Sequence, residues 1–221
     1  MDICDVTNSQ KIIKMKKSKN LIFVSAFMGL FTFTGVQAQD KVASYGFKGG
    51  LNFSNLYTDT VDDNNLLTGF NAGLYAKFPI TNSIAIQPEI SYTTKGAELV
   101  YNNAFARGTA KFNVNYIEVP VLLVMNITEN FNVHVGPYAA YMVSGKTTND
   151  SNFGSSESEL DTDDFNKLDA GLAGGVGIDL DALNFGVRYN YGLTKLGKDG
   201  AFFSSDAKNS VLSAYVGLRL N

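Results

Sequence analysis

The chain has 221 residues, with 18 basic against 21 acidic side chains and a formal net charge of −3 at pH 7. This length predicts one domain, with or without a targeting segment, and the acidic balance argues against a nucleic-acid-binding protein. Glycine (21), phenylalanine (16) and tyrosine (11) are abundant, proline is scarce (4) and tryptophan is absent, and this composition favours β structure.

A targeting segment comes first in the chain. The stretch that begins at Met15, MKKSKNLIFVSAFMGLFTFTGVQA, passes from basic residues to an apolar core and then to small residues ending at Ala38. This order is typical of a secretory signal peptide, so we predict a signal peptide over residues 1–38, with Met15 as an alternative start, and a mature domain over 39–221. An uncleaved membrane anchor is the alternative, although the apolar core is short for a spanning helix. The single cysteine, Cys4, lies in the leader, so we expect no disulfide in the mature chain.

Eight runs in which apolar residues recur at every second position follow the leader. In chain order they cover residues 45–54, 69–78, 84–95, 111–125, 131–143, 168–180, 183–193 and 212–221. Alternation of this kind is typical of strands whose two faces meet different surroundings. In the fourth run, Phe112, Val114 and Tyr116 share one phase, whereas Ile117 and Val119 share the other. We therefore predict a β-bulge near Tyr116.

Short and long connections alternate between these runs. The short turns cover residues 79–83, 126–130 and 181–182, and the long polar loops cover roughly 55–68, 96–110, 145–166 and 194–209. Short turns at one end and long loops at the other are the pattern of outer-membrane barrels, and runs of about ten residues match a tilted spanning strand. We predict an all-β fold, an eight-stranded antiparallel up-and-down transmembrane β-barrel with both termini in the periplasm and four loops outside the cell.

A soluble eight-stranded barrel of the lipocalin kind is the alternative, because alternation alone does not say which face points inward. Three features favour the membrane. The polar phase is rich in Gly, Ala, Ser and Asn rather than in Lys and Glu, which suits the narrow interior of an eight-stranded barrel. Aromatic residues gather near the ends of the runs, as in interfacial girdles, and a secretory leader precedes them.

The sixth run holds Gly171, Gly174, Gly175 and Gly177, a density that also suggests a phosphate-binding loop. Such a loop requires a helix directly after its glycines. The sequence that follows, IDLDALNFGV, predicts instead a strand end, a tight turn and another strand. Because Gly171, Gly175 and Gly177 share the inward phase, we predict that they make room for large inward side chains of neighbouring strands.

The inward phase also carries ten ionisable side chains: Lys48, Lys77, Glu89, Lys95, Glu118, His134, Asp169, Asp179, Arg188 and Arg219. Since buried charges must pair, we predict a charge network in the lumen. Its predicted members are Lys48, Lys77, Glu89, Glu118, Asp169, Arg188 and Arg219. We expect the two glutamates to pair with Lys48, Arg188 or Arg219 and to close the lumen; a polar lining that conducts small solutes is the alternative. His134 has no Ser or Asp two positions away, so we predict a structural role rather than a catalytic one.

The long loops carry two further features. The stretch DTDDFN from Asp161 does not fit a calcium-binding EF-hand, because Phe165 and Asn166 stand where an oxygen ligand and a glycine are required. Loose binding of divalent cations that bridge to lipopolysaccharide phosphates is the alternative to a solvated loop. Phe202 and Phe203, in the last loop, are expected to belong to the aromatic girdle or to pack within the loop. We predict no catalytic, cofactor or metal site.

Five segments together resemble the PorT-type outer-membrane β-barrel family, often labelled "porin family": YGFKGGLNFSNL, IQPEISYTTKGAE, NYIEVPVLL, VGPYAAYMVSG and SAYVGLRLN. The resemblance covers Gln39 to the C-terminus, and its most specific parts are Gln87-Pro88-Glu89 and Tyr116–Pro120. It implies an eight-stranded barrel in the outer membrane of a Gram-negative bacterium. It implies little about activity, although it permits an accessory role in secretion or assembly, and the word porin is not evidence of a pore. Many outer-membrane barrels end in an aromatic residue, whereas Leu220 would have to serve in that place here.

We therefore expect a monomeric outer-membrane protein without a cofactor, with a non-enzymatic structural, adhesion or binding role through its surface loops. The expected partners are the lipid bilayer, lipopolysaccharide and the outer-membrane assembly machinery, and not nucleic acid. A narrow porin for small solutes, an accessory component of outer-membrane secretion or assembly, and a lipid-modifying enzyme are the alternatives. An open lumen would favour the porin, loss of secreted proteins on deletion would favour the accessory role, and a Ser or acid beside His134 would favour the enzyme.

Overall fold

The computed structural model describes residues 42–57, 64–102, 107–152, 154–159, 166–195 and 208–221. The predicted signal peptide, the acidic stretch from Asp161 and the pair Phe202 and Phe203 lie outside these ranges, so what we expect of them stays a prediction. Within the described ranges, no helix is long and apolar enough to cross a membrane.

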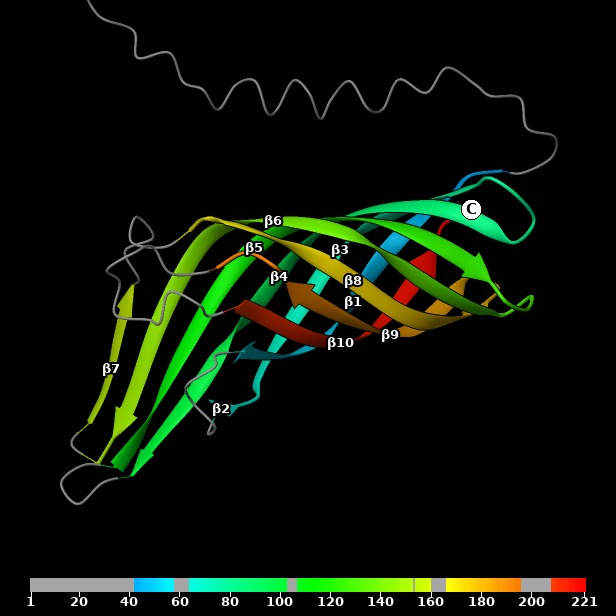
Figure 1. Ribbon diagram of the computed structural model, residues 1–221. Coiled ribbons are helices and arrows are strands. Elements are labelled where there is room, and N and C mark those ends of the chain that lie inside the picture. Colours follow the sequence, from blue (N-terminus) through cyan, green and yellow to red (C-terminus); the bar gives the residue numbers. More distant parts are fainter. Residues whose placement is uncertain (1–41, 58–63, 103–106, 153, 160–165, 196–207) are drawn as a thin grey trace, which may run out of the picture. The chain divides into compact units, whose positions relative to one another are not determined.

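Ten strands are found in the described ranges, all in one sheet: β1 (Ser44–Tyr57), β2 (Asn64–Asn65), β3 (Leu67–Pro79), β4 (Ile84–Asn102), β5 (Arg107–Asn126), β6 (Phe131–Ser151), β7 (Gly154–Glu159), β8 (Leu168–Leu180), β9 (Leu183–Gly192) and β10 (Lys208–Arg219). Each of the eight predicted runs corresponds to one of the eight long strands, although the seventh and eighth runs extend one or two residues past the ends of β9 and β10. The long strands pair in the order β4–β3–β1–β10–β9–β8–β6–β5, and β5 pairs with β4 (Figure 1). The sheet therefore closes on itself, and the predicted eight-stranded antiparallel up-and-down barrel is confirmed.

The three short turns lie where they were predicted, and two of them are built alike. Thr81 and Thr128 each stand second in a four-residue turn. The hydroxyl oxygen of Thr81 accepts the backbone N–H of Ile84 at 3.0 Å, and that of Thr128 accepts the backbone N–H of Phe131 at 3.0 Å. A hydroxyl that bonds to the backbone nearby favours a tight turn, so each threonine helps to set the register of its hairpin. We call this end of the barrel the turn end.

The loops predicted over residues 96–110 and 145–166 are largely strand, which corrects the prediction for that end of the barrel. β4 and β5 pair up to the residues Asn102 and Arg107, and β6 continues to Ser151 and pairs with β7. In Figure 1 these strands run on past the ends of the others. We call residues 96–102, 107–115 and 144–151, together with β7, the extension. Charged side chains such as Glu98, Lys111 and Lys146 stand on its outer face, so the apolar alternation that marks a spanning strand is lost there.

The two phases of the fourth run have a different cause from the one predicted. A register shift does lie between Asn115 and Tyr116, where β5 pairs with β6, close to the predicted position, but the extra residue is Val143 of β6 and not a residue of β5. The alternation of β5 nevertheless continues unbroken through it. Ile117 is exposed on the outer face, whereas Tyr116 is fully buried and Val114 packs against the buried core. The apolar residues thus change from the lipid-facing side of the strand to the interior side.

The two faces of the barrel are the reverse of those of a soluble protein. Leu172 and Val187 are exposed at 53% and 45%, whereas Lys95 and Asp169 are exposed at 1% and 0%. Apolar side chains cover the outside along all eight long strands, and charged side chains are buried inside. This arrangement suits a lipid solvent and excludes the lipocalin-like alternative.

The glycines of β8 make room for side chains of β6, as predicted. Gly171 lies opposite Tyr138, Gly175 opposite His134 and Gly177 opposite Asn132. A Cβ atom on Gly171 would meet the Tyr138 ring, and one on Gly175 would meet the His134 ring and the backbone carbonyl of Val187. These close approaches require glycine. An apolar cluster that includes Leu122 and Met142 fills a further part of the interior.

Candidate functional site

Paired charges are found inside the barrel. Eight side chains of the inward phase take part in ion pairs there: Lys48, Lys77, Glu89, Lys95, Glu118, Asp169, Asp179 and Arg188. Four of them are cations and four are carboxylates, so the charges of this set balance. They come from six strands and form three groups at successive heights, an outer group nearest the extension, a central group, and a group at the turn end.

The outer group is centred on Lys95. The Lys95 Nζ atom lies 2.6 Å from Glu118 Oε2 and 3.1 Å from Asp169 Oδ2. Asp169 also accepts hydrogen bonds from the hydroxyl of Thr194 at 3.0 Å and from the amide of Asn209 at 2.9 Å. A buried carboxylate is tolerated only when its lone pairs are satisfied in this way. The group therefore ties β4, β5, β8 and β10 together at the outer end of the interior.

The central group is centred on Glu89. Its carboxylate accepts two hydrogen bonds from the Arg188 guanidinium, at 2.7 and 2.9 Å, and one from Lys48 at 2.6 Å. The side-chain amide of Gln87 donates a further bond at 2.7 Å. The paired bonds from Arg188 have the two-pronged geometry that a guanidinium makes with a carboxylate. Strands β1, β4 and β9 are joined by this group across the middle of the barrel.

Aromatic rings lie beside the cations of both groups. Lys48 Nζ is 4.1 Å from the centroid of the Tyr215 ring, and Arg188 Cζ is 5.3 Å from the same centroid. In the outer group, Lys95 Nζ is 4.6 Å from the centroid of the Tyr138 ring. A desolvated cation is stabilised by the negative face of such a ring. The rings also fill space that the charged side chains leave, so each group is a packed layer rather than an open ring of charges.

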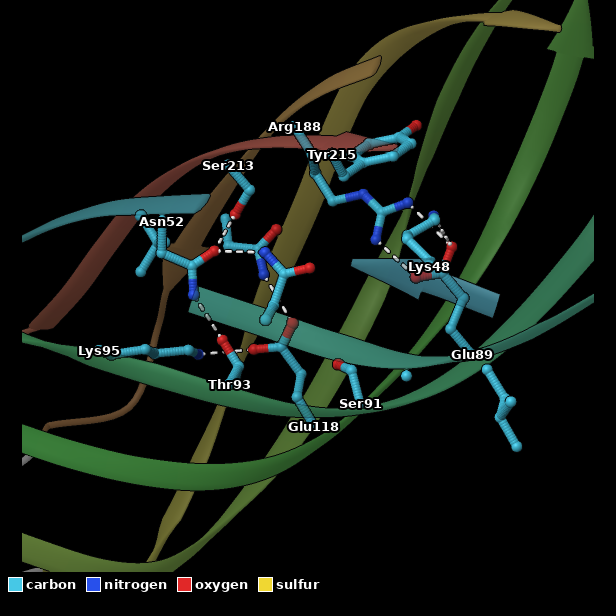
Figure 2. Close-up of a pocket in the computed structure, with 15 residues that line it drawn as sticks. Lys48, Asn52, Glu89, Ser91, Thr93, Lys95, Glu118, Arg188, Ser213 and Tyr215 are labelled. Atoms are coloured by element: carbon cyan, nitrogen blue, oxygen red, sulfur yellow. Dashed lines mark hydrogen bonds and ion pairs between the residues drawn. The ribbon is translucent and has the colours of Figure 1, made fainter. Parts of the chain in front are cut away.

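Asn52 lines the same cavity as the charged side chains of the outer and central groups. Figure 2 shows its side chain between those of Ser213 and Thr93. The Asn52 amide donates to the Thr93 hydroxyl at 2.8 Å, and its carbonyl oxygen accepts from Ser213 at 2.8 Å and from Asn71 at 2.6 Å. It also donates to the backbone carbonyls of residues 70 and 94. A single amide of β1 thus satisfies partners on β3, β4 and β10.

At the turn end, Lys77 Nζ lies 3.0 Å from Asp179 Oδ2. The amide of Asn132 donates to the same oxygen at 3.1 Å. His134 stands between this pair and the central group. Its Nε2 accepts from Arg188 Nε at 3.3 Å, and its Nδ1 lies 3.2 Å from the Asn132 side-chain oxygen. Because arginine can only donate, the imidazole is neutral with its proton on Nδ1.

The predicted network and the observed ion pairs differ for four residues. Lys95 and Asp179 share the inward phase and form ion pairs, although neither was among the predicted members. Glu89 pairs with Lys48 and Arg188, as expected, but Glu118 pairs with Lys95 rather than with any of the three cations expected for it. Arg219 is exposed, and the described part of the chain offers it no ion pair. It shares the inward phase but is the last residue of β10, where the interior meets water. The phase of a strand shows which face of the sheet a residue lies on, but not how far along the barrel axis it lies.

Two small cavities lie inside the described part of the barrel. A cavity of about 30 Å³ lies between the central and outer groups, and one of about 40 Å³ lies between the central group and the turn end. Each has room for about two to four water molecules. Lys48 and Tyr215 line both cavities and so stand between them. In the ranges that the structure describes, no group of three or more His, Cys, Asp or Glu is placed to hold a metal ion.

The outer face of the extension is the second polar surface of the molecule. Lys111 lies 3.7 Å from Glu98, and Lys146 lies 2.6 Å from Glu157. The Lys146 and Glu157 side chains are exposed at 48% and 58%, unlike the ion pairs of the interior. Exposed pairs of this kind contribute little to stability. The extension therefore presents charge to water without being needed to hold the barrel closed.

The model of the outer membrane protein beta-barrel domain family matches residues 37–197, which is more than half of the chain. The chain belongs to this family. It is a small outer-membrane β-barrel protein, and its lipid-facing apolar surface is accounted for by that location. No curated protein matches this family member in sequence.

Among solved structures, the protein is similar to the attachment invasion locus protein Ail of Yersinia pestis, at 18% identity and a TM-score of 0.48 over 81% of this chain and 100% of that one. Neisserial surface protein A is similar at 16% identity and a TM-score of 0.49, over 80% of this chain and 99% of that one. The outer membrane protein OprG from Pseudomonas aeruginosa is similar at 13% identity and a TM-score of 0.39, over 82% of this chain and 97% of that one.

Proposed function

We propose that this outer-membrane barrel does not conduct solutes and acts by binding through its extension. The observation that carries the proposal is the central group, in which Glu89, Lys48 and Arg188 pair across the middle of the lumen beside Tyr215. The two cavities on either side are separated by these side chains and hold only a few waters each. An eight-stranded barrel has an interior that side chains can fill, and here they do.

The test is single-channel conductance of the refolded protein in a planar bilayer, with folding established by heat-modifiable mobility on a gel. We expect silence from the wild type. A triple variant, Lys48→Ser, Glu89→Ser and Arg188→Ser, removes the central group and should join the two cavities, so it serves as the control in which small steps are expected. Discrete steps from the folded wild type would show that the proposal is wrong.

A narrow porin is the second candidate, and one observation favours it. The cavities on both sides of the central group are lined by polar side chains, among them Asn52 and Asn190 above and Asn132 and Asn184 below. A rearrangement of the central group would connect them. Conducting steps from the wild type would support this function.

We propose further that the protein is of the PorT type within its family. Support comes from the most specific segments of that resemblance, since Gln87 and Glu89 belong to the central group and Glu118 to the outer group. In this chain these segments supply charges of the interior. An accessory role in secretion would be supported by loss of secreted proteins on deletion of the gene.

We also propose that residues 1–38 are removed as a signal peptide and that the mature protein is a non-enzymatic monomer inserted by the outer-membrane assembly machinery. The family match begins at residue 37, close to the proposed cleavage site. Both ring nitrogens of His134, the only histidine of the chain, are hydrogen-bonded, one to Arg188 and the other to Asn132. N-terminal sequencing of protein from isolated outer membranes tests the cleavage site.

A further inference from the structure

β7 is an edge strand in the extension. It pairs with β6 through six residue pairs, from Lys146 opposite Glu159 to Ser151 opposite Gly154, and with no other strand in the described part of the chain. The closed ring of long strands leaves no edge along its paired length, and β2, two residues long and paired only with β4, is the other edge strand among the described residues. Backbone N–H and C=O groups on the outer edge of such a strand are free to pair with an added strand.

The composition of β7 leaves this edge open to pairing. Its six residues, GSSESE, are all exposed and include neither proline nor lysine, which commonly block strand edges. Glu157 and Glu159 point to the same face, together with Asp150 and Lys146 of β6. One lysine thus faces three carboxylates, and the surface beside the edge is acidic.

The charge decides which partner fits. A second copy of β7 pairing antiparallel about Glu157 would set Glu157 against Glu157, and like charges directly opposite each other destabilise a sheet. The phosphates of lipopolysaccharide carry the same sign as the edge. An apolar strand would find no apolar side chain on β7 to pack against. A strand with lysine or arginine at alternate positions is the one that gains both backbone bonds and ion pairs.

We propose that the outer edge of β7 binds an extended, basic segment of a partner protein as an added antiparallel strand. Main-chain hydrogen bonds supply the affinity, and Glu157 and Glu159 select for Lys or Arg at every second position. This inference rests on the proposed function of the extension as a binding surface, and it names the chemistry of the partner.

The probe is a fluorescent peptide with the alternating sequence Thr-Lys-Thr-Lys-Thr-Lys-Thr, titrated with the full barrel in nanodiscs of zwitterionic lipid and followed by anisotropy. We expect saturable binding to the wild type. The double variant Glu157→Lys and Glu159→Lys should weaken it by about tenfold or more, because two attractive cross-strand pairs become repulsive. The matched control is Glu129→Lys in the β5–β6 turn, which is also exposed and should leave binding unchanged.

Two further peptides separate strand pairing from general attraction of charge. The same peptide with N-methyl groups on alternate residues keeps its charges but loses donors along one edge, and a peptide with Glu in place of Lys keeps its backbone. We expect both to fail to bind. Equal binding of the N-methylated peptide, or no effect of the double variant, would overturn the proposal. Conductance by the wild type would count against the proposed function but not against strand pairing at β7, so the two failures are distinguishable.

Discussion

Lys95 holds two carboxylates, and its side chain is almost entirely buried. Substituting Lys95→Met would leave Glu118 and Asp169 buried without their cation. Removing one partner of a buried ion pair costs about 3–5 kcal/mol, so we expect the free energy of unfolding of the barrel to fall by that amount. Equilibrium unfolding in urea of protein refolded into lipid vesicles measures the change.

The control for this variant is Lys146→Met in the extension, whose pair with Glu157 is exposed. Such pairs contribute at most about 1 kcal/mol, so little change is expected. Neutralising the whole outer group, with Glu118→Gln and Asp169→Asn added to Lys95→Met, should restore part of the loss. If Lys95→Met and Lys146→Met lowered the free energy of unfolding by the same small amount, the outer group would not stabilise the barrel.

Two adjacent glycines of β8 provide a second matched pair. A Cβ atom on Gly175 would meet the Val187 carbonyl and the His134 ring, whereas a Cβ on Gly174 would come no closer than 3.9 Å to any neighbour, the His134 carbonyl oxygen. We expect Gly175→Ala to destabilise the barrel by about 1–3 kcal/mol through overpacking, and Gly174→Ala to be tolerated. The same unfolding experiment compares them, and equal effects would contradict the close packing of β6 on β8.

At the scale of strands, sequence alternation located every element that faces lipid. It failed over the extension because an apolar phase is required only where one face of a strand meets hydrocarbon. Beyond that belt, residues such as Thr109, Asn113 and Thr148 still form strands, since neighbouring strands supply their hydrogen bonds. Their pairing depends on partners distant in the sequence, and a local pattern does not reveal it.

The tip of the β4–β5 hairpin should be separable from the barrel. Glu98 and Lys111 lie directly opposite each other on β4 and β5, so residues 99–110 can be replaced by an Asn-Gly turn that joins them. We expect the shortened protein to fold, with heat-modifiable gel mobility and an unfolding midpoint close to that of the wild type, because the ion-paired groups and the lipid-facing belt are kept. Failure to refold would show instead that the tip of this hairpin is needed to form the barrel.

At the scale of the whole molecule, the outside of the barrel is its lipid-facing surface. Because the sequence has no tryptophan, the contact of single introduced tryptophans with lipid can be measured by fluorescence. A single tryptophan at Val187→Trp would lie on the exposed apolar face, and one at Asp150→Trp would lie in the extension. We expect the fluorescence of the first to be quenched by lipids brominated in mid-chain and that of the second to be unaffected. Quenching at both positions, or at neither, would contradict the assignment of the membrane-spanning belt.

The interior was predicted less completely than the outer surface, because its contacts cross the lumen. Lys95 and Asp169 are 74 positions apart on β4 and β8, which are not neighbours in the ring. Their phase placed both of them inside, but which charges meet depends on the height of each residue along its strand and on the width of the closed barrel. For the same reason Arg219, at the end of its strand, shares the phase of the network without joining it.

The amino-acid sequence by itself determined the class of fold, the direction of each strand's apolar face and the site of the short turns. These follow from two local requirements, an apolar face toward lipid and a turn between paired strands. Only the tertiary structure decided how Glu89, Lys48 and Arg188 join across the lumen, that Lys48 and Tyr215 line the cavities on both sides, and that β7 pairs with β6 alone among the described strands. Those features arise from the closure of the sheet and the stagger of its strands, which bring together side chains that no local pattern connects.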